Sequence, residues 1–293
     1  MSTTVIYTIV SLSGLGAAAA VILYMAAQKF KVYEDPRIDE VEDALPGANC
    51  GGCGYPGCRA FAEAVVKADD LSELNCPVGG NETMQKVAEI LGQEIEEKEP
   101  QVAVVRCSGS FENAPQITRY DGPPTCAIEH ALYGGETGCQ YGCLGKGDCV
   151  ESCDFEAIFM NEQTGLPYVI DENCTACGAC VEACPRDIIE LRKRNKKDRK
   201  IYVSCVSQDK GAVTRKACKV GCIGCGKCVK ECPFDAITLE NNLAYIDPVK
   251  CKLCRKCVEV CPTNSILEIG FPPRKKKNKE KKESVQSESK EKN

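Results

Sequence analysis

The longest apolar stretch of the chain lies near its N-terminus, from Val5 to Ala27. At about 1.5 Å of rise per residue it would form about 34 Å of helix, enough to cross a bilayer core of about 30 Å. No charged side chain precedes Lys29, whereas a cleaved signal peptide, the alternative, carries positive charge ahead of a shorter apolar run. Because Lys29 and Lys31 follow the stretch, the positive-inside rule predicts a single-pass anchor in the cell (inner, cytoplasmic) membrane. The bulk of the chain, after Phe30, would then lie on the cytoplasmic side.

Beyond this stretch the hydrophobic pattern is broken into short pieces. Apolar positions with helical spacing predict helices after Pro36, over residues 60–68 and over residues 82–91. Two further segments, Val102–Arg106 and Ile201–Ser204, have the composition of strands, and each leads into a cysteine.

Two hairpins with the same layout are predicted further along the chain. In each, a turn containing Gly or Asn joins two short apolar strands. The strands cover residues 157–160 and 168–171 in the first copy, and residues 236–239 and 243–247 in the second. The repetition predicts two related modules, residues 136–192 and residues 218–270.

Cysteine quartets surround these hairpins, and the chain has 24 cysteines in all. Three quartets follow the spacing C-x2-C-x2-C-x3-C-P. They are Cys174, Cys177, Cys180 and Cys184; Cys222, Cys225, Cys228 and Cys232; and Cys251, Cys254, Cys257 and Cys261. A looser quartet is formed by Cys139, Cys143, Cys149 and Cys153, with Asp154 where the others have proline.

This spacing predicts [4Fe–4S] clusters. Three closely spaced thiolates can bind three irons of a cubane, and the fourth cysteine of the run ligates the neighbouring cluster. The predicted ligand sets are Cys139, Cys143 and Cys149 with Cys184; Cys174, Cys177 and Cys180 with Cys153; Cys222, Cys225 and Cys228 with Cys261; and Cys251, Cys254 and Cys257 with Cys232. Disulfides are disfavoured because such close thiols pair poorly, and zinc is disfavoured because zinc ribbons use two separated CxxC knuckles.

A fifth cysteine group lies ahead of the modules. Cys50, Cys53 and Cys58 lie in a segment rich in Gly and Pro, and Cys76 follows as the predicted fourth ligand. Glycine lets the backbone wrap closely and turn its N–H groups toward cluster sulfurs. These features predict a fifth [4Fe–4S] cluster in a small helical domain.

Four cysteines remain, and they are Cys107, Cys126, Cys205 and Cys218. Cys107 and Cys205 each follow a predicted strand, and each precedes a second cysteine, so the two pairs resemble one another. We expect the four to converge on a sixth cluster that joins the modules; buried free thiols are the alternative. Cys218 with Cys222 and Cys225 also imitates a radical-SAM triad, but that would take ligands from the ferredoxin-type run.

The charge distribution limits the function further. The formal net charge is −5, and positive charge is concentrated in the tail from Arg274. Nucleic-acid binding is disfavoured because the basic residues do not spread over a folded face. A second basic run, Arg192–Lys200, is either a docking strip for an acidic redox partner or a solvated face. His130 is the only histidine, so haem held by two histidines is excluded, and we interpret His130 as a structural or surface residue.

The chain resembles the B-subunit family of Rnf complexes, membrane-bound ferredoxin:NAD oxidoreductases, in its long polyferredoxin form. The resemblance rests on the N-terminal anchor, on Glu34-Asp-Pro-Arg37, on Leu45-Pro-Gly-Ala-Asn-Cys50-Gly-Gly-Cys53-Gly-Tyr-Pro-Gly-Cys58 and on Tyr141-Gly-Cys143-Leu-Gly-Lys-Gly-Asp-Cys149. It implies an electron-transfer subunit of an ion-translocating oxidoreductase, with soluble ferredoxin as electron donor. The other membrane and flavin-bearing subunits of the complex would be its partners. A relay subunit of a hydrogenase or quinone-linked system, or a redox sensor, is the alternative.

Together these features predict an α+β chain: an N-terminal transmembrane helix, a small helical 4Fe-4S domain, then two two-cluster ferredoxin-like modules. The predicted segments are the anchor (1–30), the N-terminal 4Fe-4S domain (31–98), a connecting segment with extra cysteines (99–135), the first module (136–192), a basic linker with extra cysteines (193–217), the second module (218–270) and a disordered Lys-rich tail (271–293).

Overall fold

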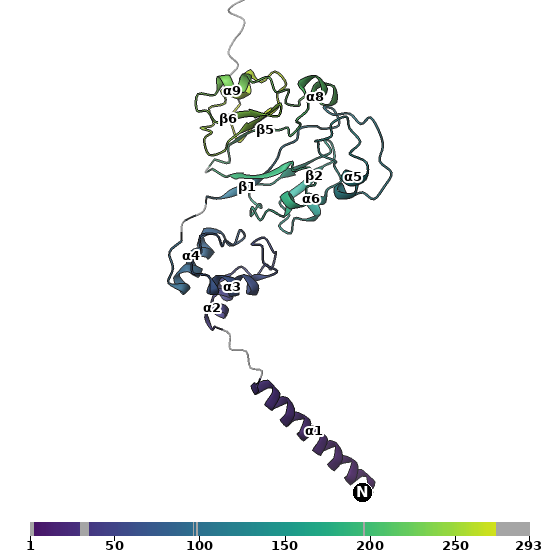
Figure 1. Cartoon of the computed structure of the whole chain (residues 1–293), viewed down its shortest axis with the longest axis vertical. Coiled ribbons are helices and arrows are strands. Elements are labelled where there is room, and N and C mark those ends of the chain that lie inside the picture. The colour runs from purple at the N-terminus through teal and green to yellow at the C-terminus, as the bar shows by residue number, and fades with distance from the viewer. Residues whose placement is uncertain (1–2, 30–34, 96, 98, 196, 274–293) are drawn as a thin grey trace, which may run out of the picture. The chain divides into compact units, whose positions relative to one another are not determined.

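The structure is a computed structural model that describes residues 3–29, 35–95, 97, 99–195 and 197–273. Contacts along the chain divide it into two compact units (Figure 1). The first unit contains Met1–Gly51, Tyr55–Leu74 and Glu82–Ile95, and the second contains Gly52–Gly54, Asn75–Asn81 and Glu96–Asn293. The tail from Arg274 lies outside the described residues, so its predicted disorder stays a prediction.

Helix α1 (Thr3–Lys29) confirms the predicted N-terminal helix. Within the described part of the chain it alone is long and apolar enough to cross a membrane, over Ile9–Ala26 with mean hydropathy 2.0. Its large apolar side chains are exposed, as Leu12 and Leu15 illustrate. A helix satisfies its own backbone hydrogen bonds, which is what a segment in lipid requires. Phe30 and Lys31 lie outside the described residues.

Three amphipathic helices follow α1. They belong to the first unit, except that the first two residues of the third helix are grouped with the second unit. They are α2 (Arg37–Ala44), α3 (Cys58–Lys67) and α4 (Gly80–Leu91). Their buried apolar residues are Ile38, Val41, Phe61, Ala62, Val65, Met84, Val87 and Ala88. α2 packs on α3, and Arg59 bonds Asp39 at 3.0 Å and Glu42 at 2.7 Å. Because these ion pairs are partly exposed they add little, so apolar burial holds the helices together. All three predicted helices are confirmed, although α3 begins at Cys58 rather than Ala60.

Short antiparallel strand pairs form the framework of the second unit (Figure 1). The pairs are β1 (Gln101–Val105) with β4 (Ile189–Lys193), β2 (Ile158–Asn161) with β3 (Leu166–Val169), β5 (Lys200–Val203) with β8 (Ile266–Ile269), and β6 (Ile237–Glu240) with β7 (Leu243–Ile246). β2–β3 and β6–β7 are the predicted hairpins, which confirms both.

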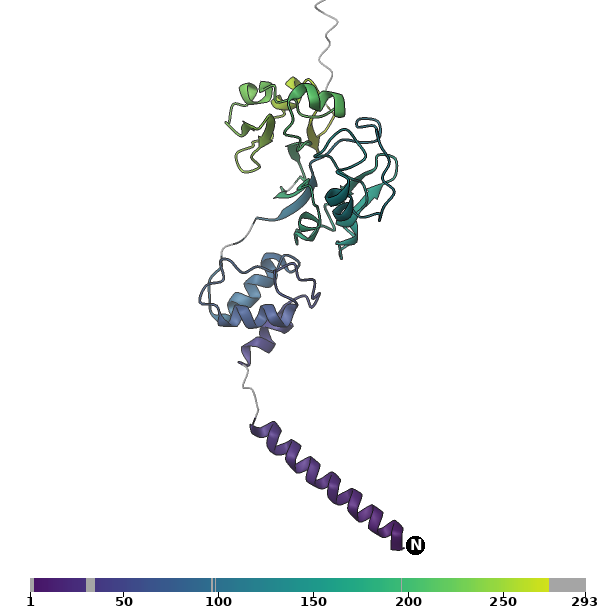
Figure 2. The same ribbon diagram turned by 45° about the vertical axis from the view of Figure 1, so that its right-hand side comes forward.

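The strand that precedes each hairpin pairs with the strand that follows it. β1 pairs with β4, and β5 pairs with β8, so each hairpin lies between an opening and a closing strand. We call residues 101–193 repeat 1 and residues 200–269 repeat 2; Figure 2 shows both from a second direction. The opening strands lie outside the predicted module ranges. Hydrophobic periodicity identifies a strand but not a partner far away in sequence.

Short helices carry the cysteine runs toward the interior of each repeat. They are α6 (Asp148–Glu151), α7 (Ala179–Glu182), α9 (Lys227–Glu231) and α10 (Lys256–Val260). Each begins after a residue with left-handed φ, such as 91° at Gly147 and 69° at Gly226. Two longer helices, α5 (Cys126–Leu132) and α8 (Gly211–Ala217), lie ahead of the first run of each repeat.

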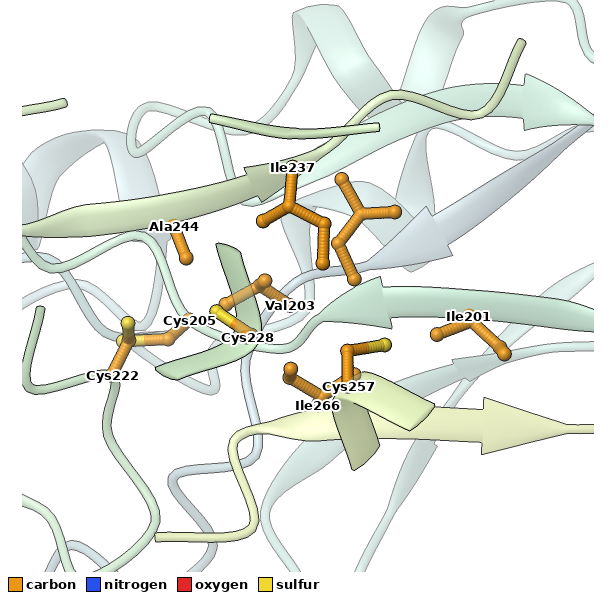
Figure 3. Close-up of a cluster of buried hydrophobic side chains, with 10 residues drawn as sticks. Ile201, Val203, Cys205, Cys222, Cys228, Ile237, Ala244, Cys257 and Ile266 are labelled. Carbon is orange, nitrogen blue, oxygen red and sulfur yellow. The ribbon is translucent and has the colours of Figure 1, made fainter. Parts of the chain in front are cut away.

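The cores of the repeats mix aliphatic residues with cysteines. In repeat 2, Val203 and Ile266 share one buried cluster with Cys228 and Cys257, as Figure 3 shows. In repeat 1, Ile158 packs with Cys149 in the same way. Several thiols of each repeat therefore face the interior together with aliphatic side chains.

Candidate metal centres

Most of the thiols of repeats 1 and 2 line four apolar cavities, which we name A to D. Cavity A is lined by Cys126, Cys143, Cys149 and Cys184. Cavity B is lined by Cys153, Cys174, Cys177 and Cys180. Cavity C is lined by Cys107, Cys139, Cys143, Cys205 and Cys218. Cavity D is lined by Cys232, Cys251, Cys254 and Cys257.

Cavities B and D each bring together four cysteines that the spacing grouped. In cavity B, burial raises the pKa of Cys180 to about 12, and repulsion from Cys174, Cys177 and Cys153 acts in the same direction. In cavity D, burial likewise raises the pKa of Cys257 to about 12. Unmetallated thiols here are therefore protonated at neutral pH, so binding iron must release protons.

Three members of a further predicted set, Cys222, Cys228 and Cys261, pack in one buried cluster of repeat 2. Burial raises the pKa of Cys228 to about 11, and Cys222, Cys225 and Cys261 are the thiols whose charges add to that effect. Cys261 differs from its neighbours. Burial alone would raise its pKa, but hydrogen bonds from Ser265 and Thr263 outweigh burial and lower it.

Cavity A differs from the predicted grouping. Cys126, which we expected beside Cys107, Cys205 and Cys218, lines cavity A instead. Burial raises the pKa of Cys149 to about 12, and among the thiols Cys126 contributes most to the remaining shift. The position of Cys126 follows from Asp148, whose carboxylate accepts the N–H groups of Cys126 at 2.7 Å and Ala127 at 3.0 Å.

Cavity C receives Cys139 in place of Cys126. Arg186 holds the loop that carries Cys139: its guanidinium donates to the carbonyls of Gln140 and Gly142 and to Nδ1 of His130. His130, which lies in α5, thus has a structural partner in Arg186, which agrees with the expected structural role. Burial raises the pKa of Cys205 to about 12, and Cys139 is among the thiols that add to this shift.

The N-terminal cysteines are placed less completely. The N–H of Cys58 donates to Asn49 Oδ1 at 2.8 Å, and the N–H of Gly79 donates to Cys76 Sγ at 3.4 Å. Cys50 and Cys58 belong to the first unit, whereas Cys53 and Cys76 belong to segments grouped with the second. Their convergence on one cluster stays a prediction.

The donor sets fit a cubane cluster better than a single ion. Each cavity offers soft thiol donors within apolar walls, which suits iron–sulfur ligation. Among the described residues, no three His, Cys, Asp or Glu side chains converge closely enough to share one ion. Zinc would need all its ligands within about 2.3 Å of one point, whereas each thiolate of a cubane binds its own iron.

Comparisons with known proteins agree with this chemistry. A family model for an Fe-S cluster domain matches residues 45–78. Models for 4Fe-4S dicluster domains match residues 138–188 and 221–265, and residues 173–237.

Curated relatives match most of the chain. It is 47% identical to the B subunit of the Na(+)-translocating ferredoxin:NAD(+) oxidoreductase complex of Acetobacterium woodii, over 78% of this chain and 68% of that protein. It is 43% identical to the B subunit of the ion-translocating oxidoreductase complex of Methanosarcina acetivorans, over 86% of this chain and 93% of the relative. It is 41% identical to the B subunit of the proton-translocating ferredoxin:NAD(+) oxidoreductase complex of Clostridium ljungdahlii, over 85% of this chain and 86% of that protein.

The chain belongs to the family of Rnf B subunits. The predicted resemblance is therefore confirmed, and the chain is an iron–sulfur electron-transfer subunit of an ion-translocating oxidoreductase. The match over residues 138–188 includes the looser quartet of repeat 1. This member of the Rnf B-subunit family thus retains a dicluster domain even where one run departs from the usual spacing.

Proposed function

We propose that this chain accepts single electrons from reduced soluble ferredoxin and relays them to the membrane and flavin-bearing subunits of an Rnf-type complex. The observation that carries the proposal is the series of buried thiol sets within one compact unit. Bound at these thiols, [4Fe–4S] clusters would supply one-electron chemistry. We further propose two two-cluster ferredoxin-like modules behind an N-terminal 4Fe-4S domain, with five clusters and a sixth in cavity C.

The chain's own residues would isolate and tune these sites. Aliphatic side chains such as Ile158 and Ile237 surround the thiols and keep water from the interior. Backbone N–H groups point at sulfurs, as at Cys107, whose Sγ accepts from Gly109 at 3.4 Å and Cys143 at 3.5 Å. Such bonds stabilise thiolate charge and raise the reduction potential of a bound cluster.

The two end residues of the predicted docking strip at Arg192–Lys200 are engaged in the fold. Arg192 and Lys200 are only 3% and 6% exposed. The Arg192 guanidinium donates to the carbonyls of Ile201 and Ile246, and Lys200 donates to the Asp171 carboxylate. These two cations stabilise the fold and are not available for docking, whereas Lys193 and Lys197 between them are exposed.

A different basic surface lies on repeat 2. Cys225 and Cys254 are the exposed members of the 24 cysteines. Exposed lysines stand beside them in the same runs, and they are Lys227, Lys230, Lys252 and Lys256. Positive charge next to an accessible cluster would steer an acidic ferredoxin into contact. We therefore place the encounter with ferredoxin on this surface, which we call the repeat 2 face.

The membrane side of the relay is proposed from α1. Its length and apolar composition support a single-pass anchor, and Lys29 at its end supports a cytoplasmic location for the rest of the chain. A cytoplasmic location also keeps the thiols reduced and available for clusters.

Anaerobic purification of the full chain in detergent tests the proposal. Iron and acid-labile sulfide should approach about 24 atoms each per chain for six cubanes, or about 20 for five. Mixing with reduced ferredoxin should then reduce the clusters, as seen by visible bleaching and electron paramagnetic resonance. Colourless protein, or protein containing zinc, would contradict the proposed function; a fully loaded protein that ferredoxin does not reduce would contradict ferredoxin as donor.

A further inference from the structure

The first cysteine runs of the two repeats share one pattern of glycines. Cys143–Cys149 reads C-L-G-K-G-D-C, and Cys222–Cys228 reads C-I-G-C-G-K-C. The glycines at matching positions have left-handed φ in both runs: 73° at Gly145, 91° at Gly147, 63° at Gly224 and 69° at Gly226. The backbones therefore follow the same course, and Lys146 stands where repeat 2 has Cys225.

The Lys146 side chain is engaged away from the thiols. Its ammonium pairs with Glu129 at 3.4 Å and Glu136 at 3.1 Å, and it lies 5.7 Å from the centre of the Tyr120 ring. Repeat 1 thus lacks a donor from its own run at this position.

Cys126 lies near the part of the run where repeat 1 has Lys146 in place of a cysteine. Cys126 lines cavity A together with Gly147 and Asp148, the two residues that follow Lys146. The Asp148 carboxylate accepts from the Cys126 N–H at 2.7 Å, so α5 is fixed against the start of α6. Thr125 caps α5 by accepting from the Ile128 N–H at 3.3 Å. The Cys126 thiol consequently lines cavity A with those of Cys143, Cys149 and Cys184.

Cys139 is matched by Cys218 of repeat 2. Residues 139–143 read C-Q-Y-G-C, and residues 218–222 read C-K-V-G-C. In both segments the glycine N–H donates to the carbonyl of the first cysteine at 3.4 Å, from Gly142 to Cys139 and from Gly221 to Cys218.

Cys107 and Cys205 are matched in the same way. Each stands two residues after its opening strand, β1 or β5. Cavity C therefore receives two equivalent thiols from each repeat: Cys107 and Cys139 from repeat 1, and Cys205 and Cys218 from repeat 2.

We propose that Cys126 replaces the absent second cysteine of the repeat 1 run, and that Cys139 is a ligand of the cluster between the repeats. One cluster is then held by Cys126, Cys143, Cys149 and Cys184, and the other by Cys107, Cys139, Cys205 and Cys218. This assignment rests on the proposed function, because it requires that the thiols bind [4Fe–4S] clusters.

Iron counts in paired variants of the full-length protein test the assignment. Cys107→Ala, Cys126→Ala and Cys139→Ala should each remove one cluster, about four irons. Cys107→Ala/Cys139→Ala should lose no more iron than either single variant, because both residues serve one site. Cys107→Ala/Cys126→Ala should lose about eight irons. Electron paramagnetic resonance of the reduced proteins should show the same spectral component absent from Cys107→Ala and Cys139→Ala.

A second test introduces a cysteine into the repeat 1 run at position 146. Lys146→Cys should restore the iron lost in Cys126→Ala but not that lost in Cys139→Ala. Glu129→Gln must accompany it, because Lys146→Cys alone would leave a buried carboxylate unpaired. The matched control is Lys146→Ser with Glu129→Gln and Cys126→Ala, which should not recover iron.

The outcomes separate the two proposals. If Cys107→Ala/Cys126→Ala matches the single variants while Cys107→Ala/Cys139→Ala loses twice the iron, the assignment is overturned. Failure of Lys146→Cys to restore iron where folding is retained by circular dichroism would also overturn it. Wild-type protein without iron would instead refute the proposed function itself.

Discussion

The two repeats differ most at the thiols nearest to solvent. Repeat 2 exposes Cys225 and Cys254, whereas every cysteine of repeat 1 is buried or half-buried. The exposed charges beside the runs also differ. Repeat 2 presents Lys227, Lys230, Lys252 and Lys256 together with the fewer carboxylates Glu231 and Glu259, whereas repeat 1 presents the carboxylates Glu151, Asp154, Glu172 and Glu182. Although the two repeats share one fold, the exposed lysines of repeat 2 would attract an acidic partner, whereas the exposed carboxylates of repeat 1 would repel it.

The repeats also differ at the end of the closing strand. The position of Arg192 in β4 corresponds to Ile269 in β8, counted from the last cysteine of each repeat. Arg192 is 3% exposed and bonds repeat 2 carbonyls, whereas Ile269 is 40% exposed. The Arg192 guanidinium also lies over the Tyr202 and Tyr245 rings. Repeat 1 thus supplies a buried cation that fixes the two repeats together, beside Arg106, which donates to the repeat 2 carbonyls of Val203 and Cys205.

Removal of this cation should have the largest effect. Arg192→Met would leave Glu190 with only Arg106 as ion-pair partner, at 3.1 Å, and would leave buried carbonyls without donors. We expect the free energy of unfolding to fall by about 3–5 kcal/mol, measured by urea unfolding under anaerobic conditions. Lys193→Met is the control, because its ion pair with Glu99 is exposed and should contribute less than about 1 kcal/mol. Equal losses in both variants would contradict a special role for Arg192.

Charge on the repeat 2 face should have the next largest effect. Replacing Lys227, Lys230, Lys252 and Lys256 by Gln should lower the rate constant for reduction by ferredoxin about tenfold at low ionic strength. The difference should disappear at high salt, because exposed charges are then screened. Stopped-flow mixing of the loaded full chain measures it.

The matched control changes the same number of charges on repeat 1. Glu151, Asp154, Glu172 and Glu182 are replaced there by Asn or Gln, and the rate should stay the same or rise slightly. A tenfold loss from both sets would show that the encounter is not confined to repeat 2.

Sequence reasoning identified the elements of this protein better than their long-range pairing. The hairpins and short helices were predictable because periodicity and turn residues are local. The pairing of β1 with β4 was not, since the two strands are separated by the whole of repeat 1. For the same reason the predicted modules began too late to include their opening strands.

The cysteine groups show the same limit. Spacing grouped the thiols of cavities B and D, because those runs keep the ferredoxin pattern. Cys126 and Cys139 line cavities other than those that spacing predicted, and the position of Cys126 depends on the hydrogen bonds of α5 with Asp148. A signal was present in the shared C-x3-C spacing of Cys139 with Cys143 and Cys218 with Cys222. It becomes interpretable only when Lys146 is aligned with Cys225.

A smaller effect is expected from the hydroxyl beside Cys261. Ser265 Oγ lies 3.3 Å from Cys261 Sγ, whereas the matching position in repeat 1 is the apolar Ile188. Losing a donor to a ligating thiolate disfavours the more negative, reduced cluster. Ser265→Ala should therefore lower the potential of one repeat 2 cluster by roughly 30 mV, or about 0.7 kcal/mol for one electron. Redox titration followed by electron paramagnetic resonance measures this, and Ser265→Thr, which keeps the hydroxyl, should restore the potential. An unchanged potential in Ser265→Ala would show that the hydroxyl does not act on the cluster.

The smallest expected effect is a difference between the opening strands β1 and β5, and it concerns the ionisation of a tyrosine at high pH. Tyr202 of β5 matches Val104 of β1, and burial raises the pKa of Tyr202 to about 12, partly opposed by the Arg192 guanidinium. Because the folded pKa exceeds the usual value of about 10, the neutral phenol contributes stability that is complete below about pH 10 and is lost as the pH rises through 12. Absorbance titration of tyrosinate should therefore show a late ionisation that Tyr202→Phe removes. Tyr168→Phe, at an exposed position of repeat 1, should leave that late step in place. If the late ionisation step also persists in Tyr202→Phe, it does not come from Tyr202, and this side chain is less buried than its position in β5 indicates.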